Sequence, residues 1–72
     1  MKLKIENNSL ALSYYKLLIA ELDNHIVFET PKKTRQELID MLQARSPWKG
    51  GYEKEWVEEI VDEAIEDWNR LA

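Results

Sequence analysis

The chain contains no cysteine and a single histidine, His25, and this restricts how so short a sequence can be stabilised. Disulfide bonds are excluded, and a closed structural zinc site is excluded because it requires four Cys or His ligands. Residues 1–72 are enough for a single domain, whose core rarely supplies more than roughly 3–5 kcal/mol without such links. The fold must therefore rest on apolar packing, to which three Trp, three Tyr and one Phe contribute large side chains.

Neither export nor membrane insertion is indicated by the sequence. The first six residues, MKLKIE, lack the long apolar run of a signal peptide, and no later stretch approaches the roughly 18 apolar residues that span a bilayer. Because cysteine is absent as well, we expect a cytoplasmic protein without contact to a membrane.

Charge is distributed unevenly along the chain. Residues 52–72 contain eight acids and two bases, a net charge of −6, whereas residues 1–51 have a net charge of +2. We therefore expect one acidic and one weakly basic end of the molecule.

The last third of the chain is predicted to be an amphipathic helix over residues 53–71. Its large apolar residues recur with the 3.6-residue period of a helix. They are Trp56, Ile60, Val61, Ala64, Ile65, Trp68 and Leu71. Gly50-Gly51 precedes this helix as a breaker, and Arg70 lies in its last turn, where the helix dipole favours a cation.

A shorter helix is predicted upstream, beginning at Thr34. Thr34 and Glu37 have the spacing of a capping box, in which each side chain bonds the backbone amide of the other. Ser46-Pro47 ends the helix, because the residue before a proline is disfavoured in the α conformation. Residues 46–51 then join the two helices.

The first thirty residues allow two interpretations. One is a helix over residues 10–23, which would give a β-α-β-α-α order. The other is a three-stranded antiparallel meander with turns at Asn7-Asn8 and at residues 23–25, which places Leu22, Ile26 and Phe28 on one apolar face. Because two independent turns agree on that face, we favour the meander. The predicted fold class is therefore α+β, a three-stranded meander covered by two C-terminal helices.

No catalytic constellation is visible in the sequence. Nucleophilic or metal-assisted catalysis needs a nucleophile with a base, or a cluster of ligands, and His25 is expected in a solvated turn. Gly50-Gly51 lacks the spacing of a phosphate-binding loop. We therefore expect no enzymatic activity, no metal and no cofactor.

The surface of the predicted final helix carries a stripe of acids. Glu55, Glu59, Asp62 and Glu66 recur at steps of four, three and four, with Glu58 and Glu63 beside them. Like charges at this spacing destabilise a helix by about 0.2–0.5 kcal/mol per pair. The stripe has two interpretations: a solvated face that keeps the protein soluble, or a surface that imitates a phosphate backbone and binds a basic partner.

Aromatic residues gather where the two predicted helices meet. Tyr52 and Trp56 are four residues apart, and Trp48 precedes them. They either fill the end of the core or, if Trp48 is exposed, provide an interface anchor.

Direct nucleic-acid binding is the less favoured alternative. It would use the basic residues of the first half, which are Lys2, Lys4, Lys32, Lys33 and Arg35. The net charge of −4 opposes this, and a helix-turn-helix is excluded in its simple form because the second helix is the acidic one.

The segment RSPWKGG at residues 45–51, followed by an acidic helix, resembles a segment of small proteins from phages and mobile elements of Gram-positive bacteria. Their pattern is R-S-x-W-x-x-G before a helix. Pro47 and Tyr52 depart from that pattern, which favours a small and an aliphatic residue there. In size, charge and lack of an active site the chain also resembles phage anti-defence proteins such as anti-CRISPR inhibitors.

These observations favour a non-catalytic inhibitor or adaptor that binds a basic, nucleic-acid-binding surface of a host or phage protein. The expected partner-binding residues are Glu55, Glu58, Glu59, Asp62, Glu63 and Glu66 with Trp48 and Tyr52. A self-associating module, for example a homodimer with a merely solubilising acidic face, is the alternative.

Overall fold

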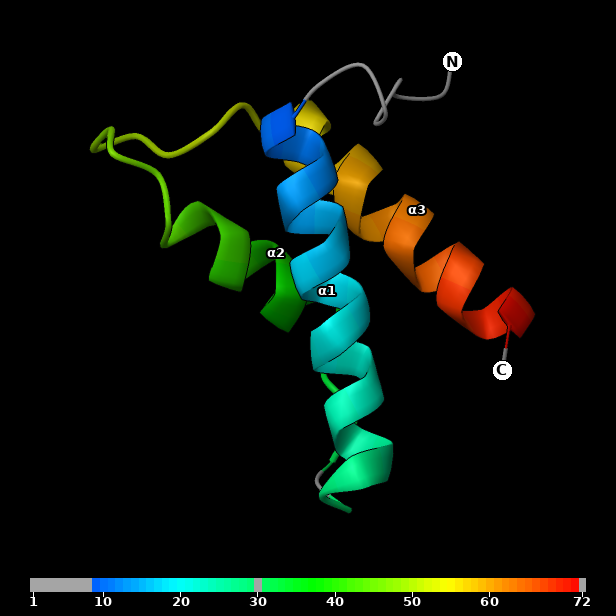
Figure 1. Ribbon diagram of the computed structural model, residues 1–72. Coiled ribbons are helices and arrows are strands. Elements are labelled where there is room, and N and C mark those ends of the chain that lie inside the picture. Colours follow the sequence, from blue (N-terminus) through cyan, green and yellow to red (C-terminus); the bar gives the residue numbers. More distant parts are fainter. Residues whose placement is uncertain (1–8, 30, 72) are drawn as a thin grey trace.

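Three α-helices make up the part of the chain that the computed structural model describes, residues 9–29 and 31–71, with Leu71 described by its backbone alone. They are α1 (Ser9–Val27), α2 (Arg35–Gln43) and α3 (Lys54–Leu71), and no strand occurs among these residues (Figure 1). The predicted α+β fold is therefore wrong, and the fold is all-α. Of the predicted meander, the Asn7-Asn8 turn lies outside the described residues.

α1 forms because its apolar residues also fit a helical period. Ala11, Tyr14, Leu18 and Leu22 are buried at steps of three, four and four, while Lys16 is exposed. The expected pairing of Leu22 with Ile26 across a turn is an i,i+4 spacing, so the predicted turn at residues 23–25 is the last part of the helix. Ile26 and Phe28, expected in the core, are 59% and 68% exposed.

α2 begins with the capping box that the sequence predicts. The Glu37 amide donates to Thr34 Oγ1 over 3.2 Å, and the Thr34 amide donates to Glu37 Oε1 over 2.8 Å. The bond from the Thr34 amide lowers the pKa of Glu37, because it favours the ionised carboxylate. The helix ends at Gln43, before Ser46-Pro47, and buries Leu38, Ile39 and Leu42.

α3 is the central element, because both other helices pack against it. Val57, Ile60, Val61 and Ala64 are fully buried on its inner side. Figure 1 shows the C-terminal end of α1 projecting beyond α2 and α3. No helix among the described residues combines the length and apolarity needed to cross a membrane.

Candidate protein-binding surface

The acidic residues of the predicted stripe lie on the side of α3 that faces away from the core. Glu55, Glu59, Asp62 and Glu66 are all exposed, and their spacing places them within a narrow arc of the helix. Glu58 and Glu63, on either side of them, are half-buried. We call the exposed four residues the acidic face.

Arg35 neutralises the middle of the acidic face. Its Nε donates to Asp62 Oδ1 over 2.6 Å and its Nη2 donates to Asp62 Oδ2 over 3.0 Å, while Glu58 Oε2 lies 3.9 Å from Nη2. The hydrogen bond to Asp62, with its negative charge, raises the pKa of Arg35. No local pattern in the sequence indicates this pair, because Arg35 and Asp62 belong to different helices.

Glu55, Glu59 and Glu66 remain as the uncompensated part of the acidic face. Each side chain is exposed, and none takes part in an ion pair between described residues. The net attraction of this face for cations therefore comes from three carboxylates instead of the expected four.

The aromatic residues at the start of α3 form one connected cluster. Tyr52 contacts Trp48 edge-on, with ring centroids 5.8 Å apart, and lies 5.1 Å from Trp56. Tyr14 of α1 shares a hydrogen bond of 2.7 Å with the Tyr52 hydroxyl, and this bond and burial raise the pKa of Tyr14. Tyr52 and Trp56 thus pack against the core, whereas Trp48 is 65% exposed.

Gln43 fixes the connection that carries Trp48. Its Nε2 donates to the Tyr52 carbonyl over 3.0 Å, and the Tyr52 amide donates to its Oε1 over 2.6 Å. Gly51, with φ of +79°, brings the backbone close enough for this pair of hydrogen bonds. The Trp48 amide also donates to Ser46 Oγ over 3.0 Å, so the loop has a defined conformation.

Basic residues, not acidic ones, flank the exposed indole within this loop. Arg45 and Lys49 are exposed, and neither forms an ion pair with the residues that the structure describes. Trp48, expected to bind a partner together with the acids of α3, therefore lies in a basic environment along the chain.

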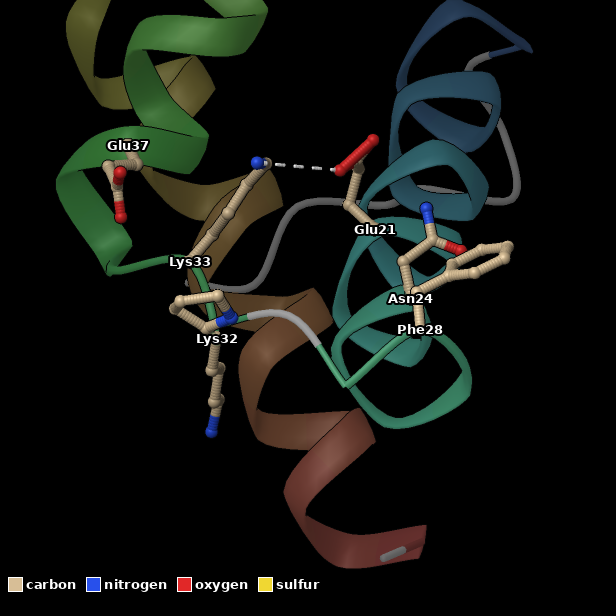
Figure 2. Close-up of a pocket in the computed structure, with 7 residues that line it drawn as sticks. Glu21, Asn24, Phe28, Lys32, Lys33 and Glu37 are labelled. Atoms are coloured by element: carbon tan, nitrogen blue, oxygen red, sulfur yellow. Dashed lines mark ion pairs between the residues drawn. The ribbon is translucent and has the colours of Figure 1, made fainter.

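The basic residues just before α2 and at its first position each contact a different neighbour. Lys33 forms an ion pair with Glu21 (Figure 2), with Nζ 3.8 Å from Oε2, and Lys32 Nζ lies 4.6 Å from the ring centroid of Trp68. Arg35 binds Asp62. These contacts tie the connection to α1 and α3, and Lys2 and Lys4 lie outside the described residues.

A pocket between the end of α1 and the start of α2 is lined by charged side chains of both signs. Its charged lining residues, Glu21, Lys32, Lys33 and Glu37, are two acids and two bases, and Phe28 also lines it (Figure 2). No group of three potential metal ligands occurs among residues 9–29 and 31–71.

His25 lies in the last turn of α1 and not in the solvated turn that the sequence predicted. It is half-buried, and its ring centroid lies 5.4 Å from that of Trp68. Its Nε2 is buried and has no hydrogen-bond partner in the described part of the chain.

Comparison with known proteins gives no further indication of function. No family model matches the chain, and no curated protein or solved structure is significantly similar to it. The resemblance to phage proteins consequently stays a prediction.

Proposed function

We propose that this chain is a non-catalytic protein-binding domain whose acidic face occupies a basic surface of a partner protein. The observation that carries the proposal concerns three carboxylates, Glu55, Glu59 and Glu66. They are exposed, and none forms an ion pair with a Lys or Arg among the described residues. Like charges along one helix face reduce its stability, so their presence is better explained by a role in binding than by a role in folding.

A nucleic-acid-binding site is the kind of basic surface that fits this arrangement. Carboxylates one helical turn apart form a row of negative charge along a rod, as phosphates do along a strand. Such a row would attract Arg and Lys side chains and compete with nucleic acid for them. The resulting role is that of an inhibitor or adaptor, and a phage anti-defence protein is one form of it.

The test uses a pair of variants with the same net charge. Glu59→Lys with Glu66→Lys changes the acidic face, while Glu29→Lys with Asp40→Lys changes exposed acids elsewhere, and both variants have a net charge of zero. An arginine-rich peptide bound to a fluorescent oligonucleotide serves as the basic probe. We expect the natural chain and the Glu29/Asp40 variant to displace the oligonucleotide, and the Glu59/Glu66 variant to lose displacement.

Equal loss in the two variants would show that total charge governs binding, and no displacement by the natural chain would refute the proposal. Far-ultraviolet circular dichroism should show the same helix content in all three proteins, because every substituted residue is exposed.

A further inference from the structure

The loop of residues 45–50, which we call the Trp48 loop, is a second surface with the properties of an interface. It presents a 65% exposed indole between two exposed cations, Arg45 and Lys49. Tryptophan and arginine are the residue types that most often dominate binding energies at protein interfaces.

Hydrogen bonds at both ends hold the Trp48 loop in place. The Gly51 amide donates to the Trp48 carbonyl over 3.0 Å, and Ser46 Oγ accepts from the Trp48 amide. The edge-on contact with Tyr52 positions the indole further. A loop ordered before binding loses little conformational entropy in a complex, which favours association.

The charges of the Trp48 loop call for an acidic partner surface. Arg45 and Lys49 form no ion pair with described residues, and Glu55, Glu59 and Glu66 form none either. One molecule therefore exposes both an uncompensated basic loop with an aromatic anchor and an uncompensated acidic helix face. Each surface of one copy is complementary to the other surface of a second copy.

We propose that the Trp48 loop of one copy docks on the acidic face of α3 of a second copy. This inference rests on the proposed function, because it assigns a partner to the same acidic face. If both loops dock at once, the contact is reciprocal and closes as a two-fold dimer. Dimerisation then covers the acidic face, so an external basic partner and a second copy compete for it.

A charge swap tests the pairing directly. In Arg45→Glu with Lys49→Glu, the loop is acidic and repels the acidic face of another copy. In Glu59→Lys with Glu66→Lys, the face is basic and repels the loop. Each variant alone should be monomeric by analytical ultracentrifugation, whereas their equimolar mixture should form a heterodimer, because both reciprocal contacts are then between opposite charges.

The natural chain should dimerise at about 0.1 M salt and dissociate at about 1 M salt, between which the Debye length falls from about 10 Å to about 3 Å. Trp48→Ala should weaken the dimer by about tenfold or more, as truncation of an interface anchor does. The Glu29/Asp40→Lys variant is the control, and it should dimerise like the natural chain.

Three outcomes would overturn the inference. They are a natural chain that stays monomeric at low salt, a dimer that survives in both charge variants, and a mixture that does not associate. Binding of a single-stranded oligonucleotide to the natural chain, lost in the Arg45/Lys49 variant without any self-association, would assign the loop to nucleic acid instead.

Failure of the proposed dimer can be distinguished from failure of the proposed function. The Arg45/Lys49 variant keeps Glu55, Glu59 and Glu66, so it should still bind the arginine-rich peptide even though it no longer dimerises. If this monomeric variant does not bind the peptide although the natural chain dimerises, the proposed function is contradicted and the dimer is not.

Discussion

Arg35, the first residue of α2, holds the carboxylate of Asp62 on α3 through two hydrogen bonds, of 2.6 Å and 3.0 Å. The pair joins the start of one helix to the middle of the other. It also divides the acidic face, leaving Glu55 and Glu59 toward the N-terminus of α3 and Glu66 toward its C-terminus. A partner that needs the whole row must displace this guanidinium.

Replacing Arg35 by Gln should therefore change stability and binding in opposite directions. The variant loses the bidentate contact, so the free energy of unfolding should fall. It leaves the carboxylates of Asp62 and Glu58 without their cation, so affinity for an arginine-rich peptide should rise by about two- to fivefold, the effect of one exposed ion pair. Chemical denaturation and a peptide titration measure the two effects.

Lys33→Gln is the matched control for this prediction. It removes the same charge and breaks the 3.8 Å contact with Glu21, but it leaves the acidic face of α3 untouched. An equal gain of affinity in both variants would show that Arg35 acts through net charge alone.

Glu59→Lys should stabilise the protein while weakening binding. Glu59 has like charges four residues away on both sides, Glu55 and Glu63, and a lysine would convert these repulsions into attractions. Each pair contributes about 0.2–0.5 kcal/mol in a helix, so the melting temperature should rise measurably. Glu59→Gln, which removes the charge without reversing it, should give intermediate values of stability and binding. If stability rises in Glu59→Lys but peptide binding is unchanged, the acidic face serves solubility and not binding.

Gly51→Ala should destabilise the connection that carries Trp48, whereas Gly50→Ala should not. A Cβ at Gly51 would lie 2.5 Å from Gln43 Oε1, in a backbone with φ of +79°, and would break the bonds between Gln43 and Tyr52. Strain of this kind costs about 1–3 kcal/mol. A Cβ at Gly50 meets nothing within 4 Å. Denaturant unfolding of the two variants, with hydrogen exchange at the Tyr52 amide, distinguishes local from general loosening.

The helices that the sequence predicted correctly are those with local signals. The capping box of Thr34 and Glu37 specifies where α2 begins, and the step pattern from Trp56 to Leu71 identifies α3. α1 has fewer polar residues to define one face, and its spacing of Leu18, Leu22 and Ile26 fits a helix as well as a turn between strands. Short apolar segments of this kind are where period alone misleads.

Of the candidate surface, the sequence predicted the row of acids on α3 but not what surrounds it. Arg35 and Asp62 are 27 residues apart in the sequence. Gln43 can bond the backbone of Tyr52 only because the end of α2 lies close to the residues that precede α3. Such contacts depend on how helices pack, and no local pattern encodes them. The basic character of the loop beside Trp48 can be read from Arg45 and Lys49 in the sequence itself.

Stability should decrease at alkaline pH through Tyr15 of α1, whose hydroxyl donates to Asp67 Oδ2 of α3 over 2.5 Å. That hydrogen bond, followed by burial and the charge of Asp67, raises the pKa of Tyr15 to about 12 from an ordinary value of 10.0. The unfolded chain therefore releases the Tyr15 proton at lower pH than the folded protein does. The stabilisation is complete below pH 10 and is lost as pH rises toward about 12.

Tyr15→Phe removes both the hydrogen bond and this titration. We expect a loss of about 1 kcal/mol at neutral pH, typical of one hydrogen bond, and a shallower fall of stability between neutral and strongly alkaline pH than in the natural chain. Tyr14, whose pKa is also raised, still contributes to the fall in both proteins, so the difference between their curves isolates Tyr15. Urea denaturation across the alkaline range gives both curves, and parallel curves would mean that the contact between Tyr15 and Asp67 does not join α1 to α3 in solution.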